Sequence, residues 1–248
     1  MRISIELVPR SEEALFSDLV LLKSNFAFID AINIPELLRY DMRSWEGARV
    51  AGEFYSAAIP HIRAIDIDLN KPLPMLPFLI ENNIKEVLVI QGDPPQDMAR
   101  TIYPTETSDI IWKIKREAPQ IKVYAGIDQY RSSMRSEEYR IKRKIQAGAD
   151  GFFTQPFYDM RYLEMYAEFL EGTEVYWGVS PVVSERSLRY WETKNKVVFP
   201  KCFQPNLDWN IKFAKQVWKF VQENNMNIYF MPIKANLVAY LAGIFSEE

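Results

Sequence analysis

The 248-residue sequence contains one cysteine, Cys202, and one histidine, His61. A single cysteine excludes an intramolecular disulfide and a cysteine-based metal site, and a lone thiol is more often a small buried hydrophobe than a nucleophile. One cysteine and one histidine make a zinc site only if carboxylates fill every other position. We therefore expect no metal in the functional site and a buried Cys202.

Long hydrophobic runs are also absent, since no segment has the roughly 18 consecutive apolar residues of a membrane-spanning helix. The start of the chain has no charged segment followed by an apolar one, so nothing indicates secretion. The net charge of −3 gives no general attraction for nucleic acid or an anionic membrane. We expect a cytoplasmic protein that binds neither.

What the sequence does contain is a regular alternation of strand and helix patterns. Hydrophobic residues make up 48% and charged residues 25%, as in globular proteins. The predicted strands cover residues 1–10, 26–32, 57–65, 86–90, 121–127, 151–154, 174–179 and 227–231. The first predicted helix starts at residue 11, the second covers 35–51 and the third ends near 83. The others cover 107–117, 137–147, 162–169, 185–193, 211–221 and 235–244.

This alternation predicts a parallel sheet, because parallel neighbours need crossover helices. Eight strand–helix units favour closure into a barrel. An open doubly wound sheet would normally carry a glycine-rich phosphate turn, and no G-x-G-x-x-G occurs in the sequence. We therefore predict an α/β protein with a single (βα)8 TIM-barrel domain over residues 1–248.

The first predicted strand carries an unusual acid. Glu6 lies near the carboxyl end of a strand that alternates Ile3, Ile5 and Leu7 with polar residues. A carboxylate there is costly to bury unless it is paired or kept protonated. The alternative is a glutamate at the strand's edge with its carboxylate in water.

Polar residues end nearly every predicted strand, and the site of a βα barrel lies at the carboxyl ends of its strands. These residues are Glu6, Asp30, Asn33, His61, Arg63, Asp66, Gln91, Asp93, Asp128, Thr154, Gln155, Ser180 and Lys234. Loops are polar in any barrel, so some of them have no role in a site. Glu6, Asp93 and Gln155 stand out because each ends an apolar run. Two carboxylates and an amide at one mouth suit binding a polar heterocycle and transferring a proton.

Five segments, taken in order, resemble the methylenetetrahydrofolate reductase family. They are residues 4–9 (SIELVP), 60–62 (PHI), 91–95 (QGDPP), 142–155 (KRKIQAGADGFFTQ) and 178–181 (GVSP). Each is a weak signal alone, but five in the family's order make the resemblance fairly specific, and the span from the first to the last, residues 4–181, is most of the chain.

The resemblance implies a barrel that carries FAD and reduces methylenetetrahydrofolate to methyltetrahydrofolate. By position, Glu6 matches the general acid, which protonates a ring nitrogen so that the five-membered ring opens to an iminium that accepts hydride. Asp93 matches an aspartate beside the pterin and the flavin. Gln155 matches a residue that hydrogen-bonds the substrate, and His61 matches a position near the flavin, although a lone histidine in a strand is about as often structural.

The remaining cofactor positions are less regular. Glu137, Arg140, Arg143 and Lys144 match a helix that contacts the FAD diphosphate and ribose, and the other candidate cofactor-binding residues are Gln91, Gly92 and Asp128. Arg140 and Lys144 are spaced i, i+4 and can share one face toward an anion. The alternative is a solvated basic helix on the barrel's exterior.

The sequence also departs from the family pattern. Gln91 stands where the family usually has arginine, and residues 126–131 lack the usual tyrosine and histidine. The second strand lacks the family's Thr-Gly-rich turn, and the aromatic residue that covers the substrate is replaced near Glu185.

These departures leave the source of the hydride open. One version keeps FAD and has NAD(P)H or a redox partner protein reduce it. A second has lost FAD and transfers hydride directly from NAD(P)H. A third is a non-catalytic pterin-binding subunit of a larger complex, and a fourth is an unrelated barrel enzyme. The substrate is folate or a related pterin, and the six Trp and thirteen Tyr allow a homo-oligomer.

Overall fold

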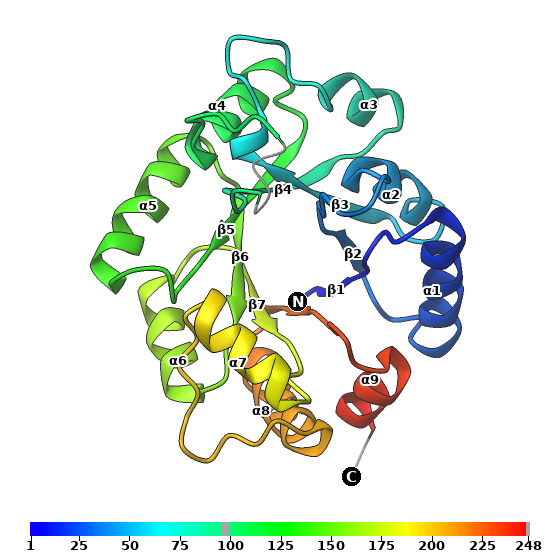
Figure 1. The fold of residues 1–248 in the computed structure, drawn as a ribbon, viewed down its shortest axis with the longest axis vertical. Helices are drawn as coiled ribbons and strands as arrows, with labels where there is room; N and C mark the ends of the chain where they lie inside the picture. The colour runs from blue at the N-terminus through cyan, green and yellow to red at the C-terminus, as the bar shows by residue number, and fades with distance from the viewer. Residues whose placement is uncertain (96–99, 247–248) are drawn as a thin grey trace.

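The computed structural model describes residues 1–95 and 100–246 and shows a closed barrel of eight parallel strands in chain order (Figure 1). The strands are β1 (Ile3–Glu6), β2 (Ala31–Ile34), β3 (Ala57–Arg63), β4 (Glu86–Ile90), β5 (Lys122–Ile127), β6 (Gly151–Pro156), β7 (Val175–Val179) and β8 (Asn227–Phe230). The predicted (βα)8 TIM barrel is therefore confirmed.

Helices surround the barrel and connect its strands (Figure 1). They are α1 (Glu12–Asn25), α2 (Ser44–Ala51), α3 (Leu76–Glu81), α4 (Thr107–Glu117), α5 (Met134–Gln146), α6 (Met160–Phe169), α7 (Glu185–Lys194), α8 (Leu207–Glu223) and α9 (Leu237–Phe245), with a 3-10 turn η1 (Ala64–Asp66). Within the described ranges, no helix has the length and apolar character needed to cross a membrane.

Local sequence signals explain where several helices begin. The Ser11 hydroxyl accepts a hydrogen bond from the backbone of Ala14 and starts α1, as its sequence predicts. Leu15, Leu19 and Leu22 then form the buried stripe of that helix. Ser133 caps α5 in the same way and so starts the helix three residues before the predicted start.

Two predicted boundaries near the start of the chain are wrong, the start of the second strand and the start of the second helix. The second strand begins at Ala31 and not at Phe26, because α1 runs to Asn25 and the backbone N–H of Phe26 still bonds to Leu22. Asp30 consequently lies at the amino end of β2, where its carboxylate accepts the N–H of Ile3, and it does not end the strand as expected.

The second helix begins at Ser44 and not near Pro35. The buried Glu36 carboxylate accepts the backbone N–H of Ser44 and lies 2.7 Å from Arg43, so residues 35–43 fold as turns before the helix.

The expectation for Cys202 is also wrong: its side chain is exposed, in the turn between α7 and α8.

The interior of the barrel is filled by side chains and is not a pore. One cluster inside the barrel comprises Ala31, Ala57, Ile59, Leu88, Tyr124, Phe153, Tyr176, Tyr229 and Met231. Phe153 and Tyr176 stack with ring centroids 4.1 Å apart and planes only 5° from parallel. A second, larger core lies between the strands and the surrounding helices.

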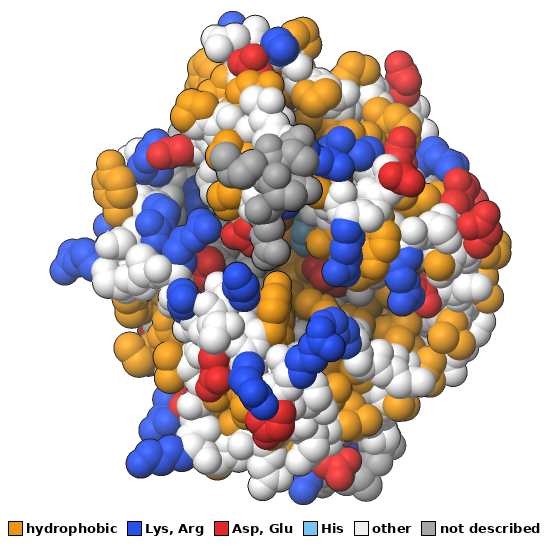
Figure 2. All heavy atoms as spheres, viewed as in Figure 1, with side chains coloured by type: hydrophobic (Ala, Val, Ile, Leu, Met, Phe, Trp, Pro, Cys, Tyr) orange, Lys and Arg blue, Asp and Glu red, His pale blue; other side chains and the backbone are white. Residues whose placement is uncertain are grey.

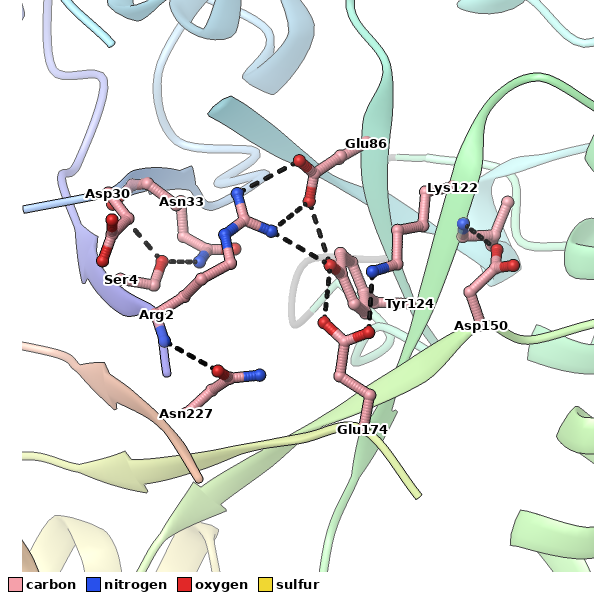
Figure 3. A network of polar contacts seen from close by, with 12 residues as sticks. Arg2, Ser4, Asp30, Asn33, Glu86, Lys122, Tyr124, Asp150, Glu174 and Asn227 are labelled. Atoms are coloured by element: carbon pink, nitrogen blue, oxygen red, sulfur yellow. Dashed lines mark hydrogen bonds and ion pairs between the residues drawn. The ribbon is translucent and has the colours of Figure 1, made fainter. Parts of the chain in front are cut away.

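A polar network closes the amino-terminal end of the barrel (Figure 3). The Tyr124 hydroxyl lies 3.0 Å from Glu86 and 3.2 Å from Glu174, and Lys122 pairs with Glu174 at 2.7 Å. Arg2 completes the network from β1 through its own pair with Glu86. The large open cavity therefore lies at the other end, where the strands have their carboxyl termini.

Candidate active site

A cavity of about 1050 Å³ lies at the carboxyl ends of the strands. Figure 2 shows a hollow on this face with Lys and Arg side chains gathered around it. Every site residue predicted from the sequence lines the cavity, namely Glu6, His61, Gln91, Gly92, Asp93, Asp128, Glu137, Arg140, Arg143, Lys144 and Gln155. This is where a βα barrel places its functional site, and the volume suits a substantial ligand.

Glu6 is the last residue of β1 and faces into this cavity. Its Oε2 accepts a hydrogen bond from the hydroxyl of Tyr229 on β8. Burial raises the pKa of Glu6 from 4.5 to about 7, although the hydrogen bond from Tyr229 acts to lower it. The alternative of a solvated carboxylate at a strand's edge therefore does not hold for Glu6.

Tyr229 is a site residue that the sequence analysis missed. Its ring belongs to the barrel interior, while its neighbours Ile228 and Phe230 belong to the outer core, as the period of two along a strand requires. That alternation was present in the sequence and indicated that Tyr229 points inward. The partner of its hydroxyl lies on β1, more than 200 residues away in the chain, and no local pattern reveals it.

His61 lies on β3 and is held by a chain of hydrogen bonds. Its Nε2 lies 3.1 Å from Oδ1 of Asn33, the Asn33 amide donates to the Ser4 hydroxyl, and that hydroxyl donates to the carbonyl of Ala31 (Figure 3 shows the Ser4–Asn33 bond). Since Asn33 Oδ1 can only accept, Nε2 carries the hydrogen and Nδ1 keeps a lone pair. Burial lowers the pKa of His61 to about 3, so the ring is neutral.

Asp93 lies in the loop after β4 and lines the outer part of the cavity. Its carboxylate is 90% exposed and 3.9 Å from Arg131, while its backbone carbonyl accepts a 2.6 Å hydrogen bond from Arg63. The structure thus brings Asp93 to the same cavity as Glu6 but leaves its carboxylate toward solvent.

Gln91 is tied to the loop that precedes α4. Its side-chain amide donates to the carbonyl of Thr105 at 3.0 Å, and its carbonyl accepts from the Thr107 hydroxyl at 3.3 Å. With both ends of the amide engaged, Gln91 positions this loop. The family usually has an arginine at this position. Gln91 is uncharged and its amide is bonded at both ends, so it provides no positive charge to the cavity.

Gln155, on β6, presents an amide to the cavity. The register between β6 and β7 shifts between Phe153 and Pro156, and the backbone carbonyl of Gln155 accepts a 2.7 Å hydrogen bond from Gln129. Its side-chain amide makes no hydrogen bond to any residue that the structure describes, so both its donor and its acceptor are available to a ligand.

The wall formed by α5 carries buried charges. Glu137 is 2% exposed and pairs with Arg140 at 2.8 Å and with Lys144 at 3.6 Å. Lys144 is 8% exposed and also donates to the carbonyl of Gly126 at 2.7 Å. The alternative of a fully solvated helix therefore does not hold for Glu137 and Lys144.

The cavity lining as a whole is cationic. Arg143 adds to the α5 wall and pairs with Glu106 at 2.6 Å. Asp128 directly follows β5, and burial raises the pKa of its carboxyl. The basic lining residues are Arg131, Arg135, Arg140, Arg143, Lys144, Lys194 and Lys196, against the acids Glu6, Asp93, Glu106, Asp128 and Glu137. This excess of positive charge on a chain of net charge −3 favours an anionic ligand.

The donor set of the cavity suits organic ligands. Within the residues that the structure describes, no group of three or more His, Cys, Asp or Glu side chains is arranged to hold a metal ion. The side chains that do converge on the cavity offer a proton, an amide and positive charge.

Fold and site together define a (βα)8-barrel protein with a carboxyl of raised pKa and a cationic wall at the carboxyl ends of its strands. The family model "Methylenetetrahydrofolate reductase" matches residues 42–222, which is most of the chain. The chain therefore belongs to the methylenetetrahydrofolate reductase family, as its resemblance predicts.

Curated relatives match this chain at low identity. The 5,10-methylenetetrahydrofolate reductase of Buchnera aphidicola subsp. Schizaphis graminum is 24% identical over 150 residues, which cover 57% of this chain and 50% of that protein. The enzyme of the same name from Pectobacterium carotovorum is 23% identical over 151 residues, 58% of this chain and 50% of the relative. This chain spans about half the length of the curated relatives it matches.

Solved structures share the barrel at still lower identity. An uncharacterized Clostridium thermocellum protein, described as binding two copies of 5-methyl-5,6,7,8-tetrahydrofolic acid, aligns with a TM-score of 0.63 and 13% identity over 98% of this chain and 92% of its own. A 2,3-dimethylmalate lyase aligns with a TM-score of 0.59 and 11% identity over 98% and 77% of the two chains. At such identities these likenesses show the fold alone.

Proposed function

We propose that the protein reduces 5,10-methylenetetrahydrofolate, or a related methylene-pterin, to the 5-methyl form by hydride transfer, as an oxidoreductase acting on CH–NH groups. The observation that carries this proposal is the placement of the Glu6 carboxyl in the cavity at the carboxyl end of β1, where burial raises its pKa to about 7. Membership of the family supports it, as does the description of the C. thermocellum neighbour as a methyltetrahydrofolate-binding protein.

Glu6 acts as the general acid of the proposed reaction. It donates its proton to a nitrogen of the substrate's five-membered ring, and the adjacent C–N bond breaks with its electron pair going to that nitrogen. The resulting iminium carbon accepts the hydride. A group whose pKa is about 7 suits this task, because it is protonated in a useful fraction of molecules and is still acidic enough to give the proton away.

Three other residues bind the heterocycle in this proposal. The free amide of Gln155 offers one donor direction and one acceptor direction to the pterin edge. Neutral His61 offers the Nδ1 lone pair. Asp93 contributes negative charge at the outer part of the cavity, where it favours a cationic intermediate.

The cavity is large enough for the family's cofactor, and its α5 wall carries cations that would face a diphosphate. When bound there, FAD would supply the redox chemistry that carries hydride from NAD(P)H to the substrate. Arg140, Arg143 and Lys144 would hold its diphosphate from α5, and the other predicted positions, Gln91, Gly92, Asp128, Glu137 and His61, line the same cavity.

One observation favours the second version, in which no FAD is used and NAD(P)H gives hydride directly. Glu137 already neutralises Arg140 and Lys144, and Glu106 already pairs with Arg143. An anionic cofactor would have to compete with these carboxylates, which weakens its binding. A nicotinamide that binds and leaves in each turnover tolerates weaker binding than a resident flavin.

The absorbance spectrum of the purified protein separates the two versions. A flavin spectrum supports the first, while a colourless protein that oxidises NAD(P)H only when methylene-pterin is added supports the second. Binding of methylene-pterin without turnover under either condition, including with added FAD and artificial reductants, would contradict the enzymatic proposal and leave a pterin-binding subunit. A redox partner protein and a homo-oligomer stay predictions.

Glu6→Gln tests the assigned acid directly. The substitution keeps the shape of the side chain and removes the transferable proton, so we expect turnover to fall by about 10²-fold or more with pterin affinity largely kept. Glu13→Gln, on the exposed face of α1, is the matched control and should leave turnover unchanged. Parental turnover by Glu6→Gln would exclude Glu6 as the acid.

A further inference from the structure

The hydrogen bond from Tyr229 to Glu6 joins the last strand of the barrel to the first, across the cavity floor. We propose that Tyr229 is a positioning residue for the Glu6 acid: its hydroxyl occupies Oε2, so that the transferable proton resides on Oε1, and it stabilises the carboxylate left after transfer. This inference rests on the proposed function of Glu6.

Tyr229 is rigidly placed for this role. In the parallel register of β8 it lies beside Ser4 of β1 and Gly178 of β7. Its ring packs edge-on against Phe153, with centroids 5.1 Å apart and planes at 87°, and only 3% of the residue is exposed. A buried ring inside a packed barrel has little freedom to turn, so the hydroxyl is fixed relative to Glu6.

No other described residue donates a hydrogen bond to Glu6. Asn33 is its direct neighbour in the register of β1 and β2, but the Asn33 amide is committed to Ser4 and its carbonyl to His61. His61 is neutral and directs its Nε2 hydrogen to Asn33. The position of the acid proton within the Glu6 carboxyl is therefore set by Tyr229.

The other charged residues that line the cavity, among those the structure describes, do not contribute to the raised pKa of Glu6. Those on the other walls are Asp93 of the β4 loop, Glu106 before α4, Asp128 and Arg131 after β5, Arg135, Glu137, Arg140, Arg143 and Lys144 of α5, and Lys194 and Lys196 at the end of α7. None of them is a cause of the raised pKa of Glu6, which comes from burial and is opposed only by Tyr229. Because the Tyr229 hydroxyl bonds directly to Glu6, its removal should change that pKa.

The step balances without another reactant. The proton leaves Oε1 of Glu6 for the substrate nitrogen, the C–N bond breaks toward that nitrogen, and Glu6 becomes a carboxylate. The hydrogen bond from Tyr229 becomes charge-assisted at that moment and strengthens, because both carboxylate oxygens now share the negative charge. An interaction that is stronger after transfer than before it lowers the barrier to transfer.

Tyr229→Phe removes the hydroxyl and keeps the ring. We expect the alkaline limb of the pH–rate profile to move upward by about one pH unit, since a hydrogen bond to a charged group is worth about that much. We also expect turnover at low pH to fall by about 10-fold, because the weaker acid gives up its proton less readily. Tyr176→Phe is the control, since it removes a buried hydroxyl from the same interior cluster without touching Glu6.

A second readout does not depend on turnover. The carboxyl C=O band that disappears in Glu6→Gln follows the protonation of Glu6 in pH-difference infrared spectra. Its midpoint should rise by about one pH unit in Tyr229→Phe and stay in place in Tyr176→Phe. Tyr229→Met serves the same comparison if Tyr229→Phe does not fold.

The outcomes are distinct. An unchanged infrared midpoint and an unchanged alkaline limb in Tyr229→Phe would overturn the role of Tyr229, even if Glu6→Gln shows that Glu6 is the acid. A protein that does not turn over methylene-pterin would overturn the proposed function. In that case the infrared midpoint still decides whether Tyr229 controls the protonation of Glu6.

Discussion

Arg2 and Glu86 form a two-pronged ion pair at the amino-terminal end of the barrel, with Nη1 2.9 Å from Oε2 and Nη2 3.1 Å from Oε1 (Figure 3). The pair links the residue just before β1 to the first residue of β4. Both side chains are largely buried, and Glu86 also contacts the Tyr124 hydroxyl. The chain thus keeps charge at both ends of the barrel, paired within the protein at one end and lining an open cavity at the other.

Glu86→Gln should destabilise the protein. The substitution leaves the Arg2 guanidinium partly buried without a counter-charge, which we expect to lower the free energy of unfolding by about 2 kcal/mol. Urea denaturation followed by circular dichroism measures this. The control is Glu53→Gln, which breaks an exposed i, i+4 pair with Arg49 and should cost less than about 0.5 kcal/mol. Equal effects would show that the Arg2–Glu86 pair contributes no more than a surface pair.

Stability should depend on pH through Glu6. Because its pKa is about 7 in the folded protein, against an ordinary value of 4.5, the folded state binds a proton that the unfolded state has released between these pH values. Its contribution is fully present below about pH 4.5 and is lost as pH rises through 7. Glu6→Gln removes this dependence, so its stability relative to the parent should rise by about 2.5 kcal/mol from about pH 5 to about pH 8. A constant difference in denaturation free energy would contradict the raised pKa.

The sequence predicts the fold well because strand and helix periods are local properties. Ile110, Ile111 and Ile114 lie on one face of a helical period, and all three are buried in α4. The boundary errors arose where tertiary contacts decided the outcome. Phe26 belongs to an apolar run typical of a strand, but its backbone N–H bonds to the carbonyl of Leu22. The second helix begins at Ser44, later than predicted, where the backbone N–H of Ser44 bonds to the Glu36 carboxylate.

The sequence predicted which candidate residues line one cavity, but it did not predict their contacts. Strand-end placement brought Glu6, Gln155 and His61 to one cavity, because closure of the barrel requires it. Contacts across the barrel left no local signal. The partner of Glu6 lies on β8, and the exposure of Asp93 depends on how its loop folds over Arg63.

His61 should be neutral and in a single tautomer. As the only histidine, it gives unambiguous ¹⁵N signals in a histidine-labelled sample. We expect a protonated Nε2, an unprotonated Nδ1 and no titration above about pH 4, because burial lowers its pKa to about 3. Asn33→Ala removes the acceptor of the Nε2 hydrogen and should produce a mixture of tautomers. A signal that titrates near pH 6.5 in the parent would contradict the buried neutral ring.

Arg143 should matter for an anionic ligand more than for folding. The side chains of this Arg143–Glu106 pair are 40% and 54% exposed, so Arg143→Gln should change the free energy of unfolding by less than about 0.5 kcal/mol. FAD and NADPH both carry a diphosphate, and we expect loss of this cation to weaken binding of the one that the protein uses by about 10-fold. Fluorescence titration measures it. Arg161→Gln is the control, because Arg161 pairs with Asp159 at the start of α6, outside the cavity lining. Equal affinities in the two variants would exclude Arg143 from the binding site.

Gly92 should tolerate no side chain, because two separate constraints act on it. Its φ of +81° is in the left-handed region, and an added Cβ would lie 3.0 Å from Nε and 3.2 Å from Cζ of Arg63, which holds the carbonyl of Asp93. Gly172 isolates the first constraint, since its φ is +78° and nothing lies within 4 Å of the added Cβ.

Gly172→Ala should therefore cost about 1 kcal/mol in the free energy of unfolding, and Gly92→Ala about 2 kcal/mol. Only Gly92→Ala should also reduce turnover, because displacing Arg63 releases the loop that carries Asp93 into the cavity. Denaturation and steady-state kinetics on both variants measure the two effects. If both variants lose the same stability and keep parental turnover, the contact between Gly92 and Arg63 does not position the loop.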